Sequence, residues 1–371
     1  MASPRGTAKA PKRDTPAILI AGAGPTGLTA AVELARRGVS LRIVDRDEGP
    51  TPLSKAVGIA AHSLDILEPS GVTERLLAEG IRIRHVGAHA GGATLATLDF
   101  ANLPHRYDFM LSLPQSETEK AMASALRAMG VEVEWSTRLE TLERTGTGWA
   151  ATFGTGERAE FATVFGADGI HSAVRREAGI AFEGYVHERT WSIADAEIGD
   201  WPYEPGAAHA FLNGGGDIGF IIPIGPARFR AVSNTADALA QIPGPYAVRR
   251  VLRSDTFELP IKQAASYAQP GLFLGGDAAH VHSPIGARGM NLGIEDAASF
   301  ARRYVDGTLE GYEAERRPVG RQWIAFSERV LAAAQTRNPL AVAARNAAIR
   351  LVGALPPLQR IMLKRVAGID E

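Results

Sequence analysis

One short stretch of the sequence, GGDAAHVHSPIGARGMN (residues 275–291), brings a carboxylate and two imidazoles close together. Asp277, His280 and His282 lie within six positions, and both groups are common metal ligands. A metal site would need a further fixed ligand, and no other acid or histidine cluster supplies one. The intervening small residues suit a close approach of the backbone to a flat ligand. We therefore predict no metal here and expect His280 to be a hydrogen-bonded structural residue.

A glycine motif near the start of the chain predicts a dinucleotide site. Gly22, Gly24 and Gly27 form G-x-G-x-x-G after an apolar strand and before a helix. Asp45 follows at the end of the next strand, close to the roughly 20-residue separation of a dinucleotide fingerprint. The glycines let the backbone approach a pyrophosphate, the helix N-terminus supplies N–H donors, and the carboxylate accepts from ribose hydroxyls.

A second glycine-rich segment, LNGGGDIGF (residues 212–220), does not repeat this pattern. An extended segment follows it rather than a helix, which favours a hairpin turn. The sequence therefore predicts a single dinucleotide-binding fold.

The remaining pattern predicts an α/β protein interrupted by a β-rich region. Residues 17–21 form a buried strand, residues 61–77 a helix, and Ser116 with Glu119 a capping box. Short strands divided by glycine and proline fill the middle of the chain, which indicates an antiparallel sheet. From residue 294 onward we expect helices, with breaks at Pro318, Pro339 and the pair at 356–357.

These signals predict four parts of the chain. They are a disordered tail (1–15), a Rossmann-type domain (16–182 with 268–318, of which 82–110 contributes to the substrate side), a β-rich domain (183–267) and C-terminal helices (319–371). The last part mixes apolar residues with arginine and lysine. An interfacial membrane helix would share that pattern, but we favour packing against the protein.

Composition excludes several classes of function. A net charge of -1 gives no field to attract nucleic acid, and no apolar run is long enough for an integral membrane segment. With 0 cysteines, thiolate metal sites and dithiol chemistry are excluded. The N-terminus lacks the apolar core of a secretory signal, so we expect a cytoplasmic protein, either a monomer or a homodimer.

Three segments together resemble the FAD-dependent aromatic hydroxylases, the class A flavoprotein monooxygenases with the p-hydroxybenzoate hydroxylase fold. They are GAGPTG near the start, GADGIHSAVRR at 166–176, and the stretch at 275–291; LPQSETE and YEAERRP are also similar to segments of that family. The resemblance extends from Pro16 to about Pro318. It implies that the Rossmann-type domain binds FAD and that the β-rich domain covers a substrate.

The resemblance also implies which residues contact the cofactor. Gly22, Gly24, Gly27, Asp45 and Arg46 would hold the diphosphate and adenosine ribose; Gln115 would lie along the flavin, Asp168 near the diphosphate, and Asp277 on the ribityl chain. The backbone from residue 284 to residue 291 would line the isoalloxazine ring, with Pro284, Gly286, Gly289, Met290 and Asn291 as the contact residues.

The sequence departs from the family pattern at three positions. Ala287 replaces a common glycine, Arg288 a common glutamine, and Lys55 a common arginine. Lys55 keeps the positive charge but lacks the planar guanidinium fork, which changes how it can contact FAD or a moving flavin.

By resemblance, the protein uses NAD(P)H and O2 to hydroxylate a phenolic or polycyclic aromatic substrate through a flavin C4a-hydroperoxide. The segments 209–213 and 219–225 and the surroundings of Trp191 would form the substrate walls. His209 and Tyr185 are candidate bases, although each also suits a structural role. The alternatives are epoxidation or double-bond reduction on the same fold, and a non-catalytic FAD-binding protein.

Overall fold

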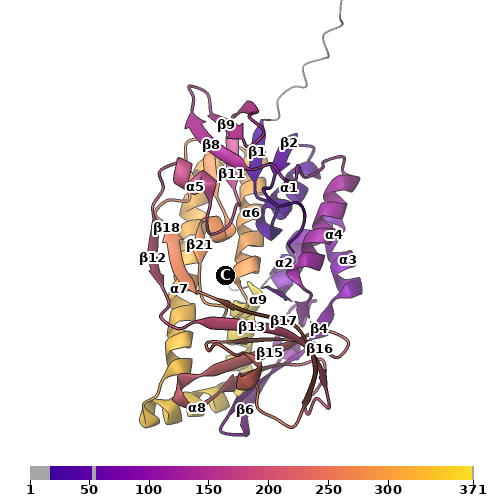
Figure 1. The fold of residues 1–371 in the computed structure, drawn as a ribbon, viewed down its shortest axis with the longest axis vertical. Coiled ribbons are helices and arrows are strands. Elements are labelled where there is room, and N and C mark those ends of the chain that lie inside the picture. Colours follow the sequence, from indigo (N-terminus) through magenta and orange to yellow (C-terminus); the bar gives the residue numbers. More distant parts are fainter. Residues whose placement is uncertain (1–16, 52–55, 370–371) are drawn as a thin grey trace, which may run out of the picture.

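The computed structural model describes residues 17–51 and 56–369. The predicted tail and Lys55 therefore lie outside the described residues. Figure 1 shows two sheets at opposite ends of an elongated molecule, with long helices running between them.

The first end is built on a five-stranded sheet in the order β19-β20-β11-β1-β2. β1, β2, β11 and β20 are parallel, and β19 is antiparallel at the edge. β1 and β11 are buried throughout, and only Thr163 among their residues is polar, as expected where helices cover both faces. The strands are β1 (Ile18–Ala21), β2 (Leu41–Val44), β11 (Thr163–Gly166), β19 (Ala268–Gln269) and β20 (Leu272–Leu274).

Helices and three small sheets surround this layer. The helices are α1 (Pro25–Ala35), α2 (Ala61–Leu67), α3 (Val72–Glu79), α4 (Gln115–Ala128), α5 (Ala173–Glu177) and α6 (Gly289–Asp306). The sheets are β3 (Gly58–Ile59), β7 (Met110–Ser112) and β4 (Ile81–Ile83); β10 (Arg158–Phe161), β9 (Trp149–Phe153) and β8 (Leu139–Arg144); and β12 (Phe182–Val186), β18 (Pro260–Ala264) and β21 (His280–Val281). The predicted helix over 61–77 is divided because Gly71 adopts a left-handed φ of 74° between α2 and α3.

The second end is a seven-stranded sheet in the order β17-β13-β16-β15-β14-β5-β6. Its strands are β5 (His85–Ala90), β6 (Ala93–Asp99), β13 (Trp191–Gly199), β14 (Ala208–Leu212), β15 (Ile218–Gly225), β16 (Arg228–Ser233) and β17 (Ala247–Phe257). β14 and β15 pair as an antiparallel hairpin across residues 213–217, so the predicted hairpin reading of the second glycine segment is confirmed. Segments that precede and follow β11 in the sequence therefore build this sheet together.

The two faces of the seven-stranded sheet have different neighbours. The inner face carries Ile193, Phe220 and Val232; Phe220 and Val232 pack against a buried cluster that includes Leu331 of helix α7 (Tyr312–Gln335). The outer face carries Phe211 and Phe229, which form a separate small core with residues 238–242.

The chain ends in three helices: α7 (Tyr312–Gln335), α8 (Pro339–Ala354) and α9 (Pro356–Ala367). The predicted break at Pro318 is wrong, because α7 continues through it. Proline inside a helix costs about 3 kcal/mol. Buried Tyr312, Arg316 and Trp323 recur along one side of α7, and their packing outweighs that cost. No helix in the described part of the chain is long and apolar enough to cross a membrane.

Candidate cofactor and substrate cleft

A long cleft connects the first sheet to the inner face of the second. It consists of a cavity of about 500 Å³ at the ends of β1 and β2 and a cavity of about 730 Å³ that reaches the seven-stranded sheet. The two share a border that includes Gly24, Arg46, Thr51, Gln115 and Asp168. One extended ligand could therefore occupy both.

The three glycines of the first motif have different roles. Gly22 has a φ of +101°, and a Cβ there would lie 2.3 Å from the carbonyl oxygen of Ala167. A Cβ on Gly27 would lie 1.8 Å from the carbonyl oxygen of Gly22, so this glycine permits close packing of α1. Gly24 faces open space, and a side chain there would project into the cleft. Gly24 is also the N-cap of α1 and provides no capping side chain, which leaves the first N–H groups of the helix available to an anion.

Asp45 stands beside this helix end. Its Oδ2 accepts a hydrogen bond from the Ala23 N–H at 2.5 Å, and its Oδ1 accepts one from the Asp47 N–H at 2.9 Å. The carboxylate is thereby fixed at the wall of the first cavity, where its remaining lone pairs can accept from hydroxyl groups. The glycine cradle, the uncapped helix and the fixed acid fit the pyrophosphate and ribose of a dinucleotide.

Gln115 is oriented by a residue whose role the sequence did not reveal. The Gln115 Nε2 donates to Glu119 Oε1 at 2.8 Å, and Glu119 Oε2 accepts from the Thr51 N–H at 3.2 Å. Burial raises the pKa of Glu119 to about 7, although these two hydrogen bonds oppose the shift. The predicted capping box is wrong: α4 begins at Gln115 with Pro114 as its N-cap, so Glu119 turns to the cavity instead of to the helix end.

Asp168 lines both cavities and also organises the turn into α5. Its carboxylate accepts from the Ser172 hydroxyl at 2.5 Å and from the N–H groups of Ala173 and Val174 at 2.6 and 3.0 Å. Burial raises the pKa of Asp168, and these hydrogen bonds oppose the shift. The side chain thus shapes the rim of the cleft at the junction of the two cavities.

The 276–289 loop forms the floor of the second cavity. Exposed Asp277 lines it, as do Pro284, Gly289 and Met290. Gly286 and Asn291 are not among the described lining residues. Gly286 has a φ of +84° and lies against Trp323.

Buried Asn291 holds this loop from behind. Its Oδ1 accepts from the Ala60 N–H and the Ser63 hydroxyl, both at 2.8 Å. Its Nδ2 donates to the carbonyls of Gly58 at 2.9 Å and Ala287 at 2.8 Å. All the hydrogen-bonding positions of the amide are therefore used within the protein, and Asn291 supports the loop rather than lining the cavity.

The two histidines of the loop lie in different surroundings. His280 is 2% exposed, and its Nε2 lies 2.7 Å from Asp296 Oδ2, which agrees with the predicted structural role. His282 donates from Nδ1 to the Ser283 carbonyl at 2.7 Å, and burial lowers its pKa to about 3. Within residues 17–51 and 56–369 no group of at least three His, Cys, Asp and Glu residues could hold a metal ion.

The inner face of the seven-stranded sheet gives the second cavity an apolar wall. Ile193, Val232, Phe257 and Leu259 line it. Of the substrate walls predicted from sequence, the surroundings of Trp191 contribute through Ile193. Segments 209–213 and 219–225 contribute no residue to the described lining.

The two candidate bases lie elsewhere. His209 is on the outer face of the sheet, where its Nδ1 lies 3.0 Å from His89 Nε2 and its ring packs 4.5 Å from that of Tyr203. Burial, with a further contribution from His89, lowers the pKa of His209 to about 4. Tyr185 is 49% exposed on β12, and its hydrogen bond to Glu328 raises its pKa to about 12. Neither side chain is among the described residues that line the cleft.

This combination of a Rossmann-type cradle, a glycine-rich loop and a covering sheet defines a flavoprotein that binds FAD. Residues 14–327 match the model of a family described as "FAD binding domain". The chain belongs to this family, and the predicted resemblance to FAD-dependent aromatic hydroxylases is confirmed.

Individual relatives agree with this assignment. The chain is 32% identical to 6-methylpretetramide 4-monooxygenase of Streptomyces rimosus over 97% of its length and 70% of the relative. It shares its fold with p-nitrophenol 4-monooxygenase of Pseudomonas putida DLL-E4 (TM-score 0.85, 20% identity, 96% of this chain and 98% of that one). It is also similar to a Diels-Alderase of pyrroindomycin biosynthesis (TM-score 0.80, 26% identity, 95% and 80% covered).

Proposed function

We propose that the protein is an FAD-dependent monooxygenase that uses NAD(P)H and O2 to hydroxylate a phenolic or polycyclic aromatic substrate. The observation that carries the proposal is the continuous cleft, which joins a dinucleotide cradle to an apolar wall across a glycine-rich loop. The similarity to 6-methylpretetramide 4-monooxygenase supports the same reaction type. A cytoplasmic location, where NAD(P)H is available, belongs to this proposal.

The residues of the cleft divide into those that would hold FAD and those that would hold the substrate. Gly22, Gly24 and Asp45 would bind the diphosphate and ribose, and Gln115 and Asp277 would contact the rest of the cofactor along the shared border and the loop. Reduced FAD, once bound, supplies the activation of O2. Ile193, Val232 and Phe257 would then exclude water and orient the aromatic ring against the loop.

No side chain of the cleft needs to act as a nucleophile in this proposal. His282, which lines the second cavity, donates from Nδ1 to the Ser283 carbonyl, so its Nε2 carries no proton in the neutral ring. That nitrogen can accept a hydrogen bond. A pKa of about 3 makes it too weakly basic to take a proton from a phenol.

The test is the anaerobic reduction rate of bound FAD by NADPH and by NADH, with and without a panel of phenols and polycyclic aromatics. We expect one ligand class to accelerate reduction, and aerobic turnover with that ligand to yield a product heavier by one oxygen atom. Bound FAD that NAD(P)H does not reduce with any ligand would contradict the proposal.

The similarity to a Diels-Alderase supports one second candidate, a cyclisation that consumes no NAD(P)H. On that reading FAD would be bound tightly yet remain oxidised during turnover. A polyene substrate cyclised at the same rate with and without NAD(P)H would favour it over hydroxylation.

A further inference from the structure

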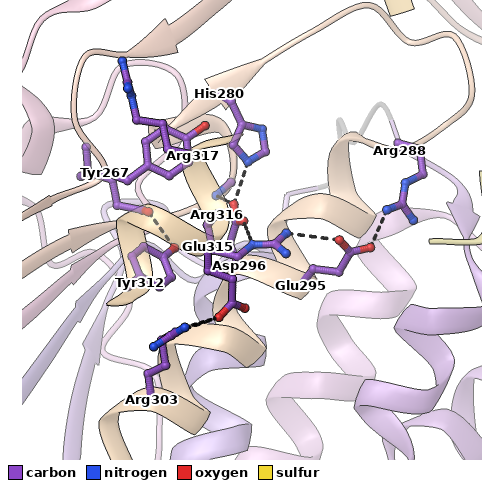
Figure 2. Close-up of polar contacts among 12 residues, drawn as sticks. Tyr267, His280, Arg288, Glu295, Asp296, Arg303, Tyr312, Glu315, Arg316 and Arg317 are labelled. Carbon is purple, nitrogen blue, oxygen red and sulfur yellow. Dashed lines mark hydrogen bonds and ion pairs between the residues drawn. The ribbon is translucent and has the colours of Figure 1, made fainter. Parts of the chain in front are cut away.

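A chain of buried charged residues ties both ends of the 276–289 loop to helices α6 and α7 (Figure 2). At the start of the loop, Asp296 Oδ2 accepts from the Gly276 N–H at 3.0 Å and lies 2.7 Å from His280 Nε2. Asp296 Oδ1 accepts from Arg316 Nε at 2.7 Å. The Asp296 side chain is 1% exposed, so these contacts are shielded from water.

The other end of the loop is connected to the same group of buried charged residues through Glu295, the residue immediately before Asp296 in α6. Arg288 Nη2 donates to Glu295 Oε1 at 2.5 Å, and Glu295 Oε2 accepts from Arg316 Nη2 at 3.2 Å. Arg316 thus bridges the two neighbouring acids, one serving each end of the loop, as the dashed lines of Figure 2 show.

The two ends are held with unequal strength. Burial alone would raise the pKa of Asp296, but His280 and Arg316 outweigh it and lower the pKa to about 2, so this carboxylate stays ionised. Arg288, by contrast, leaves its buried Nε and Nη1 without hydrogen-bond partners; a single ion pair and a cation–π contact, 5.4 Å from the Trp323 ring centre, hold it. The residues before it are in left-handed conformations, with φ of +84° at Gly286 and 53° at Ala287. A non-glycine residue there stores on the order of 1 kcal/mol of strain.

We propose that Glu295, through its ion pair with Arg288, is a positioning residue that fixes residues 284–288 against the bound flavin, with Arg316 and Asp296 as its anchor. The inference rests on the proposed function, because it requires FAD in the cleft. Pro284 and Gly289 line the cavity on either side of the tied residue, so the pair controls the shape of that wall.

One substitution can remove the Arg288–Glu295 ion pair while leaving the ion pairs of Arg316 with Glu295 and Asp296 in place. In Arg288→Gln, Glu295 still faces Arg316 at 3.2 Å, so no carboxylate is left buried without a cation. Glu295→Gln instead strands the Arg288 guanidinium, which is 4% exposed. The double variant E295Q/R288Q replaces the ion pair by two neutral amides and removes that penalty.

The same two helices offer a matched control. Arg303 of α6 forms an ion pair with Glu315 of α7 at 2.7 Å. Glu315 immediately precedes Arg316, but among the described residues neither Arg303 nor Glu315 contacts the 276–289 loop. Arg303→Gln therefore breaks one ion pair between α6 and α7 while leaving the loop tied.

The experiment measures the Kd of FAD for the apoprotein by fluorescence quenching, the visible circular dichroism of the bound flavin, and the melting temperature of each full-length variant. We expect R288Q to weaken FAD binding by about tenfold, corresponding to 1.4 kcal/mol of coupling, and to alter the flavin dichroism. R303Q should stay within about twofold of the wild type and keep its spectrum, whatever its melting temperature.

The outcomes separate the two proposals. Failure of the wild-type chain to bind FAD would remove the proposed function itself. Tight FAD binding with an unchanged spectrum in R288Q, as in R303Q, would overturn the positioning role alone, because a purely structural pair affects only the melting temperature. If R288Q does not fold, E295Q/R288Q carries the same test and the same contradiction.

Discussion

At the scale of single residues, the most informative side chains are those whose environment differs from what their sequence context indicates. Ala287 occupies a left-handed conformation that L-residues other than glycine adopt at a cost. Glu119 matches a capping pattern yet lines the first cavity. In both cases local sequence indicates one role and the surrounding chain imposes another.

The strain at Ala287 leads to a stability prediction. Ala287→Gly should raise the free energy of unfolding by up to about 1 kcal/mol, because glycine tolerates a φ of 53°. Urea denaturation of the apoprotein measures this. Ala344→Gly is the control, since Ala344 is exposed in the interior of α8 and the added backbone freedom should lower stability by about 1 kcal/mol. Equal losses in both variants would contradict the strain argument.

The raised pKa of Glu119 predicts a pH effect of defined sign. The carboxyl titrates near 4.5 in the unfolded chain and at about 7 in the folded one, so the folded state binds more protons between these values. Its contribution to stability is complete below pH 4.5 and is lost as pH rises through 7. Glu119→Gln should therefore flatten the fall in unfolding free energy over this range, by roughly 1–3 kcal/mol at pH 8. Parallel curves for the variant and the wild type from pH 5 to pH 8 would rule this out.

At the scale of elements, the seven-stranded sheet separates two environments. Alternation along β14 places His209 on the outer face, while Ile193 on β13 and Val232 on β16 line the cleft from the inner face. A one-residue shift of register would exchange these faces. Sequence alone therefore could not decide whether His209 meets a substrate.

The position of His209 predicts a pH effect opposite to that of Glu119. Its imidazole titrates at about 4 in the fold and near 6.5 when unfolded, so the unfolded chain binds more protons in between. The protein should lose stability as pH falls from 6.5 to 4, and His209→Gln should reduce that loss by roughly 1–3 kcal/mol. The lowered pKa of neighbouring His89 leaves part of the slope in place.

The same variant tests whether His209 acts in catalysis. Because the side chain is not among the described residues of the cleft, aerobic product formation by His209→Gln should stay within about twofold of the wild type. A loss of several hundredfold, typical of a missing general base, would place His209 in the reaction after all.

At the scale of the whole molecule, the last helix of the chain lies between the two ends of the fold. Figure 1 shows α8 at the far end of the seven-stranded sheet and α9 running back between that sheet and the FAD-binding end. α9 buries Leu363 and Ala367 in a cluster that also includes Ala287 of the loop. α8 buries no described residue and leaves Leu340 82% exposed. The expected packing role therefore holds for α9.

Because only one side of α9 is buried, replacing a large apolar residue by alanine should lower the free energy of unfolding on that side of the helix and not on the other. Leu363→Ala should cost about 2–4 kcal/mol of unfolding free energy, because Leu363 is 1% exposed and its removal leaves a cavity. Ile361→Ala should change it by less than about 0.5 kcal/mol, since Ile361 is 63% exposed. Chemical denaturation measures both, and similar costs would show that α9 does not pack as described.

Elements with local sequence signals could be predicted without the structure. The G-x-G-x-x-G turn, the buried strands around it, Asp45 and the small residues of the 276–289 loop follow from backbone sterics and the two-residue and 3.6-residue periods. These features suffice for the family and the cofactor. Tertiary structure decided everything that depends on distant partners: the continuation of α7 through Pro318, the turning of Glu119 to the cavity, and the face occupied by His209. It also created the ion chain from Asp296 to Arg288, because residues from three separate segments meet only when α6, α7 and the loop are packed together.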